Sequence, residues 1–113
     1  MKHDPLNKLL LEKFPKLNDN FKDSIYDLDT PSYNFYQELF VPYIKEQISN
    51  NDTIELNRCF EFVEDMLKSN NEQLQEIAQN NILLILYEDE DVDFSLLPLK
   101  ELSYQYYLEW LKI

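Results

Sequence analysis

The residues with the clearest spacing for metal chemistry are the carboxylates of the acidic run EDEDVD, in the last third of the chain. Asp89, Asp91 and Asp93 match the first three ligand positions of a calcium-binding loop. That loop also needs glycine at its sixth position and glutamate at its twelfth, where this chain has Phe94 and Lys100. The pattern therefore favours a solvated acidic loop over a metal site. A patch that faces a protein partner is the functional alternative, and weak cation binding is a minor one.

Other reactive side chains are few. The single histidine, His3, lies too close to the N-terminus to anchor a zinc site or to act as a positioned base. The single cysteine, Cys59, falls on the apolar stripe of a predicted helix, where Glu55 one turn earlier disfavours its thiolate. Glycine is absent, which excludes Gly-rich phosphate loops, dinucleotide fingerprints and nucleophile elbows. The sequence predicts a protein that is not an enzyme and holds no metal or cofactor.

Charge is the most informative property of the composition. The 113 residues carry 10 Lys and Arg against 22 Asp and Glu, a net charge of −12, which disfavours binding to nucleic acid or to anionic membranes. Residues 1–50 hold six Lys and eight acids (−2), whereas residues 51–113 hold four basic residues and fourteen acids (−10). An unpaired cysteine fits a reducing compartment, so we expect a cytoplasmic protein. The acidic field of the second half attracts cationic partners or simply maintains solubility.

Apolar residues recur near the 3.6-residue helical period along most of the chain. The sequence therefore predicts an all-α protein, a single compact domain over residues 1–113 with about five helices arranged as stacked helical hairpins. The central hairpin spans Thr53 to Glu88. We expect helices over residues 5–14, 31–48, 53–68, 72–87 and from about 99 onwards, with an irregular or short helical connector over 16–30.

Capping and proline signals add detail to these helices. Asp4 is expected to cap the first helix, and Asp52 or Thr53 the third. Pro42 interrupts the second helix and should kink it, because proline removes a backbone donor and clashes with the preceding turn. The apolar run over residues 82–87 is compatible with a strand, but its helical lead-in favours helix. Without glycine, turns that need a positive φ should use Asn or Asp.

Two kinds of side chain remain after the core is assigned. The C-terminal Tyr and Trp side chains cannot all enter one core, and such residues are favoured at protein interfaces, although they also cover the rim of a small core. Carboxylates of the third helix and of the acidic run would steer a cationic partner, although helix-surface acids are mostly a solvated face. The candidate partner-binding residues are Glu61, Glu64, Asp65, Tyr87, Glu88, Asp89, Glu90, Asp91, Asp93, Tyr104, Tyr107 and Trp110.

The segment FEFVEDMLKSNNEQLQEIAQNNILLILYED combines an F-x-x-x-E-x-x-L pattern, a short polar joint and a second helical pattern. It resembles an uncharacterised family of small bacterial all-helical proteins, over about residues 55–90. Members of that group are often presumed to be immunity proteins. The resemblance therefore implies a small cytoplasmic inhibitor that protects a cell from a toxin delivered by its neighbours.

Two functions follow as hypotheses. The first is a non-enzymatic immunity protein whose acidic C-terminal half docks onto a basic toxin domain and occludes its active site. The second is a helical scaffold or regulatory module that binds a peptide or helix in an apolar groove formed by Phe62, Met66 and the aromatic residues of the second helix. Tolerance of high salt would favour the second, because charge-steered binding is screened. The sequence leaves the oligomeric state open.

Overall fold

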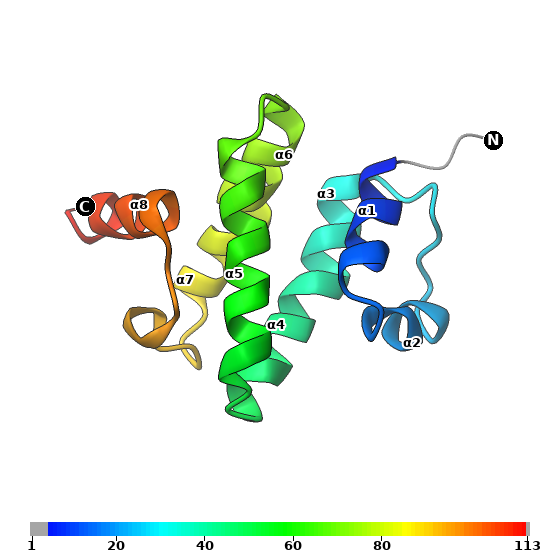
Figure 1. The fold of residues 1–113 in the computed structure, drawn as a ribbon, viewed down its shortest axis with the longest axis horizontal. Helices are drawn as coiled ribbons and strands as arrows, with labels where there is room; N and C mark the ends of the chain where they lie inside the picture. The colour runs from blue at the N-terminus through cyan, green and yellow to red at the C-terminus, as the bar shows by residue number, and fades with distance from the viewer. Residues whose placement is uncertain (1–4, 113) are drawn as a thin grey trace.

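The helix at the middle of the molecule is α5 (Thr53–Lys68), and the other helices flank it on both sides in the computed structural model (Figure 1). The structure describes residues 5–112, so Asp4 and His3 lie outside the described part. Among the described residues there is no β-strand, which confirms the all-α class and the expected number of longer helices. The other elements are α1 (Pro5–Lys13), α2 (Leu17–Lys22), α3 (Ser32–Phe35), η1 (Tyr36–Phe40), α4 (Val41–Ser49), α6 (Glu72–Glu76), η2 (Ile77–Leu83), α7 (Leu84–Glu88), η3 (Phe94–Leu96) and α8 (Glu101–Leu111).

The second long helix runs without a break through α3, η1 and α4, and its middle part is π-helical. The π turn ends at Phe40, which leaves Pro42 in the first turn of α4. Proline is tolerated in a first turn because the N–H it lacks has no partner there. The irregularity expected at Pro42 therefore takes the form of a wide π turn that precedes the proline.

Side-chain caps and one left-handed residue shape the joints around α5. Asp52 Oδ1 accepts a hydrogen bond from the Glu55 amide at 3.1 Å, which confirms Asp52 as the cap of this helix. Asn51, in the turn before it, has φ of 53°, as expected for a turn made without glycine. Asn71 caps α6 by accepting from the Leu74 amide at 3.1 Å. These caps fix the start of each arm of the predicted hairpin.

The second arm of the hairpin is one helix through α6, η2 and α7, so the apolar run at 82–87 is helical, as predicted. Its middle is again π-helical, and η2 packs against η1 of the other long helix. Asn81 Nδ2 donates to Gln37 Oε1 at 2.9 Å and joins the two π segments. A π turn rotates side chains away from the ordinary helical positions. The paired π segments therefore set which residues of the two helices meet.

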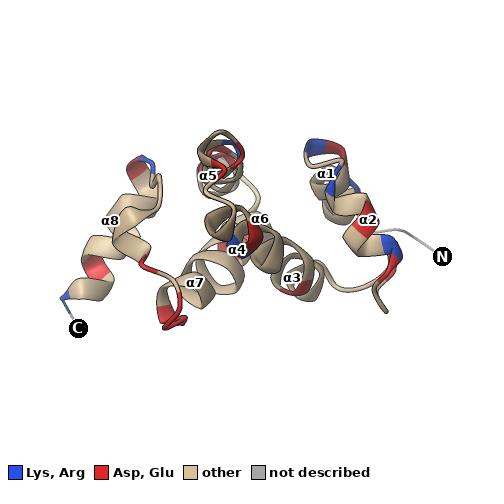
Figure 2. Cartoon of the chain, turned by 90° about the horizontal axis from the view of Figure 1, so that it is seen from below, with Lys and Arg blue, Asp and Glu red and all other residues tan. Residues whose placement is uncertain are grey.

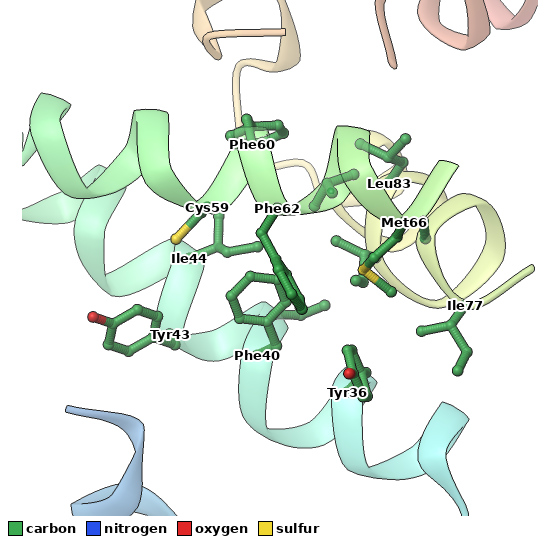
Figure 3. Packing of buried hydrophobic residues seen from close by; sticks show 14 of the residues in the cluster. Tyr36, Phe40, Tyr43, Ile44, Cys59, Phe60, Phe62, Met66, Ile77 and Leu83 are labelled. Atoms are coloured by element: carbon green, nitrogen blue, oxygen red, sulfur yellow. The ribbon is translucent and has the colours of Figure 1, made fainter. Parts of the chain in front are cut away.

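The core lies on two opposite sides of α5. Figure 3 shows Phe60 and Phe62 projecting from opposite sides of this helix, and α5 accordingly contacts α4, α6, η2 and α8. Phe62 packs 5.4 Å from Phe14 and 5.8 Å from Phe40, centroid to centroid, and stacks on Tyr36 at 6.5 Å. These rings pack against one another and leave little surface for a ligand. The apolar groove predicted at Phe62, Met66 and the second-helix aromatics is therefore not an open site. Apart from Tyr33, which is 51% exposed, those side chains belong to the core.

Candidate functional site

Four aromatic side chains of the C-terminal third pack together beside α8. Tyr87, in α7, lies 5.1 Å from Trp110 and 6.1 Å from Tyr107, measured between ring centroids. Phe94 of η3 lies 5.2 Å from Tyr107 and 6.2 Å from Trp110. The geometries are tilted or edge-on, as aromatic pairs prefer. The predicted anchors Tyr87, Tyr107 and Trp110 are thus half-buried, because each uses part of its surface to fasten α8 to the chain.

The five carboxylates of the acidic run have different roles. Asp89 forms an ion pair with Lys45 of α4 at 2.5 Å and accepts from the Asp91 amide at 2.9 Å. Asp93 caps η3 by accepting from the amide and the hydroxyl of Ser95, at 3.1 and 2.6 Å. Glu88, Glu90 and Asp91 expose their side chains. Asp89 and Asp93 therefore hold the loop, and Asp93 remains exposed while it does so, as do the other three carboxylates.

The ion pair between Lys45 and Asp89 shifts the pKa of both side chains. The hydrogen bond from Lys45, and then that from the Asp91 amide, lowers the pKa of Asp89 below its ordinary value, and the same contact with Asp89 raises the pKa of Lys45. A lowered carboxyl pKa gives stability that is present above the unfolded-state pKa and is lost as pH falls through the folded-state pKa. The pair therefore holds the loop at neutral pH and releases it as pH falls through the lowered pKa of Asp89.

Replacing Lys45 with glutamine should bring the pKa of Asp89 back toward its ordinary value and loosen the loop at neutral pH. An NMR titration of the Asp89 carboxyl, with amide exchange of residues 89–93, measures both effects. Lys8→Gln, at an exposed lysine of α1, is the matched control and should change neither. An unchanged Asp89 titration in Lys45→Gln would show that the pair does not control this carboxyl.

An open groove of about 560 Å³ lies between this loop and α8. Loop residues 90–95 form one wall, and Tyr87, Tyr107 and Leu111 form the other. We call this feature the acidic groove, because Glu90 and Asp91 on its rim are exposed. Its wall is aromatic and aliphatic, so it offers apolar contact area beside negative charge. The geometry suits a cationic, partly apolar surface.

Glu64 is not a surface carboxylate, contrary to its place among the candidate partner-binding residues. It is only 5% exposed and points from α5 to the start of α8. Its Oε2 accepts from the Leu102 amide at 2.7 Å, and its Oε1 accepts from the Ser103 amide at 3.2 Å. The helix N-terminus is short of acceptors and favours negative charge, so this contact is stabilising. Glu64 therefore positions the candidate surface without belonging to it.

Glu61 and Asp65 are exposed on α5, but the fold separates them from the acidic run. They line a small cleft of about 190 Å³ together with Lys13, Phe14, Arg58 and Phe62, on the side of α5 that faces α1. The loop after α7 lies toward α8, on the other side of α5 (Figure 1). Figure 2 likewise shows the red loop after α7 well apart from α5. The candidate acids thus form two groups, and Glu61 and Asp65 share their cleft with two cationic side chains.

Buried titratable groups on α5 hold helices together. Tyr43 donates a hydrogen bond to Glu55, which also pairs with Arg58 at 2.5 Å. Arg58 in turn donates to the Lys13 carbonyl oxygen at 2.8 Å and joins α5 to α1. Burial raises the pKa of Tyr43 above its ordinary range, and burial followed by the charge of Glu55 raises the pKa of the Cys59 thiol to about 12. Cys59 is therefore a core thiol, as the sequence predicted.

Within residues 5–112, no three His, Cys, Asp or Glu side chains gather in a way that could hold a metal ion. The Asp89 and Asp93 contacts explain this for the acidic run, since each of these carboxylates is turned toward its own local partner. In the same part of the chain, no helix combines the length and the apolar character needed to cross a bilayer.

These features define a class: an all-α domain with a central helical hairpin and an acidic groove at its C-terminal end. The chain belongs to the family described as Domain of unknown function (DUF7674), which matches residues 7–112. The family match therefore extends well beyond residues 55–90, over which the sequence suggested a resemblance, and it includes the N-terminal half. No curated protein and no solved structure matches the chain.

Proposed function

We propose that this chain is a non-enzymatic protein-binding module whose acidic C-terminal end recruits a basic protein surface. The observation that carries the proposal is the position of Glu88, Glu90 and Asp91. All three carboxylates are exposed, and Glu90 and Asp91 border a groove with an aromatic and aliphatic wall, next to Glu88 in the chain. Charge brings a cationic partner to such a site, and the apolar wall supplies contact area after water has left. The side chains proposed to meet the partner are Glu88, Glu90, Asp91, Tyr104, Tyr107 and Trp110.

The charge distribution supports this proposal. Residues 51–113 carry ten of the twelve net negative charges, so the electrostatic field is strongest over the half that contains the groove. Such a field raises association rates with cationic proteins and weakens as salt is added. The same field repels nucleic acid and anionic membranes, so the partner is a protein. The Cys59 thiol, with its raised pKa and buried position, is unsuited to nucleophilic catalysis at neutral pH.

In its particular form, the proposal is an immunity protein that binds and neutralises a bacterial toxin domain. The resemblance of residues 55–90 to presumed immunity proteins supports this form, together with the acidic surface that a basic toxin domain would need. A rigid helical domain that covers the toxin's active site would neutralise it without chemistry. We place the protein in the cytoplasm, where the unpaired Cys59 is stable. A neighbouring gene for a large secreted protein with a C-terminal toxin domain is expected, and growth of cells that produce this domain should require the present chain.

Neutralising the three exposed loop carboxylates should slow association with that toxin domain. The triple variant Glu88→Gln, Glu90→Gln and Asp91→Asn keeps Asp89 and Asp93, so the loop retains its internal contacts. We expect the association rate constant at low salt to fall roughly tenfold and its dependence on salt to flatten, because electrostatic steering is lost. Stopped-flow measurements over a range of salt concentrations test both expectations.

The matched control removes three exposed charges at the other end of the molecule, with Glu12→Gln, Asp19→Asn and Asp23→Asn. Residues 12, 19 and 23 lie on or next to α1 and α2, which Figure 1 shows on the far side of α5 from α8. This variant has the same net charge as the loop variant, so it separates a local effect from a global one. Equal rates for the two variants would remove the acidic loop from the mechanism.

A further inference from the structure

The outer face of α8 carries an exposed apolar stripe. Tyr104, Leu108 and Leu111 are 50%, 40% and 55% exposed. They are four and three residues apart, so they lie on one face of the helix and follow its axis for about 10 Å. A contiguous apolar strip on a soluble domain marks an interaction surface more often than scattered single residues do. The stripe is therefore a second feature of the C-terminal end that folding alone does not explain.

The stripe and the acidic groove form one surface. Leu111 belongs to both, since it ends the stripe and lines the groove. The Tyr104 ring, on the stripe, lies 6.3 Å from the Tyr107 ring in the groove wall. Glu90 and Asp91 border the same groove on its loop side. An apolar strip with acid along one edge is complementary to an apolar strip with basic residues along one edge.

The negative charge of Glu90 and Asp91 favours one kind of partner for this surface over the others. A second copy of the chain would meet it through a two-fold contact, in which each patch faces its own equivalent. Such pairing would bring Glu90 and Asp91 of the two copies toward one another and would be repelled. A membrane with anionic lipids is disfavoured by the same carboxylates. A protein segment with Lys or Arg beside apolar residues satisfies both parts of the surface.

We propose that the α8 stripe and the acidic groove together receive one amphipathic basic helix of the partner, an inference that rests on the proposed protein-binding function and specifies its partner. A helix fits because the stripe is itself a helical ridge, and ridges of one helix pack into the grooves of another. An extended segment has less support, because the described residues contain no strand whose edge it could join. The apolar face of the occupant covers Leu108 and Leu111, and its basic residues reach Glu90 and Asp91.

The probe is a synthetic peptide of about 18 residues, long enough to form a helix when bound, with leucines on one face and lysines beside them. Trp110 is the only tryptophan and lies 6.2 Å from Phe94 of the groove wall, so its fluorescence should report binding to the intact chain. We expect saturable binding of this peptide. A peptide of the same composition in scrambled order should bind at least roughly tenfold more weakly, because its leucines no longer share one face.

The test variant is Leu108→Ser with Leu111→Ser, which should weaken peptide binding roughly tenfold or more. Both side chains are exposed, so the fold should be kept. The matched control, Ile25→Ser with Ile54→Ser, changes two side chains that are 92% and 78% exposed elsewhere and should bind as the wild type does. Equal binding of the stripe variant and the wild type, or equal binding of the ordered and scrambled peptides, would overturn the helix proposal.

Two further outcomes keep this inference separate from the proposed function. If the stripe variant binds the peptide normally while the loop-charge variant does not, the acidic protein-binding function stands and the α8 helix site is overturned. If neither variant changes binding, both proposals fail at this end of the molecule. A wild-type chain that sediments as a dimer, with Leu108→Ser and Leu111→Ser restoring a monomer, would make a second copy the occupant and would also overturn the inference.

Discussion

Replacing Phe62 with alanine should lower the free energy of unfolding by about 3–5 kcal/mol, the usual cost of removing a packed aromatic ring from a core. The ring joins α5 to the α1–α2 connection and to the second long helix, because it contacts Phe14 of that connection and both Tyr36 and Phe40 of η1. The Phe62 side chain is 7% exposed. The rings around it also pack against each other, so they cannot easily move into the cavity that the substitution leaves. Urea denaturation followed by circular dichroism gives the change.

Ile54→Ala is the control for this substitution. Ile54 lies on the same helix but is almost fully exposed, so its replacement should change stability by no more than about 0.5 kcal/mol. The comparison also decides between two roles for Phe62. In an open binding groove, its loss would leave stability intact and reduce peptide binding. A stable Phe62→Ala variant would therefore contradict the packing described above and restore the groove hypothesis.

Much of the fold could be predicted from local sequence signals, namely apolar periodicity and capping residues. The α5 hairpin is set by two apolar stripes of helical period and by caps at Asp52 and Asn71, each acting within one turn. The turn at Asn51 follows from the absence of glycine, because another residue must then supply the positive φ. The core position of Cys59 follows from the same stripe. Local periodicity and capping suffice for these features since no distant contact competes with them.

The features that the sequence did not reveal depend on distant contacts. Both π segments lie where two long helices meet, and the Gln37–Asn81 hydrogen bond that joins them spans 44 residues. Glu64 lies in a series of acids on α5, and spacing alone does not separate the two buried ones, Glu55 and Glu64, from the exposed ones. One signal was present: the cap position of α8 holds Lys100, which has no side-chain acceptor, so another residue must supply one.

The sequence predicted most of the residues of the candidate surface, but not which of them lie together. The sequence placed Glu61, Asp65 and the acidic run in one acidic half, and the fold puts them on different sides of α5. The aromatic residues were expected to divide between core and surface, and Tyr87 does both, since it packs on Trp110 and lines the acidic groove. A count of charged residues does not say where they lie in space. Only the packing of α8 against α5 shows which acids share a site with which aromatic rings.

Replacing Glu64 with alanine should lower the free energy of unfolding by about 2–4 kcal/mol, because two amides at the start of α8 lose a charged acceptor in a buried place. The Lys100 amide keeps its bond to Ser103 Oγ at 2.8 Å, so the first turn is weakened and not abolished. Hydrogen exchange at the Leu102 and Ser103 amides should become faster than the loss of global stability alone explains. These two amides donate the hydrogen bonds that the Glu64 carboxylate accepts. Denaturant titration and exchange by NMR measure the two effects.

Glu61→Ala, one turn earlier on the exposed side of α5, is the matched control and should leave both measurements unchanged. Glu64→Gln keeps the shape and one side-chain oxygen but loses the charge, so its stability should fall between those of Glu64→Ala and the wild type. Since α8 carries the stripe of Tyr104, Leu108 and Leu111, Glu64→Ala should also weaken peptide binding, although Glu64 itself lies below the surface. Unchanged exchange at Leu102 and Ser103 would show that α8 is held by its aromatic contacts alone, and the binding surface would then be independent of position 64.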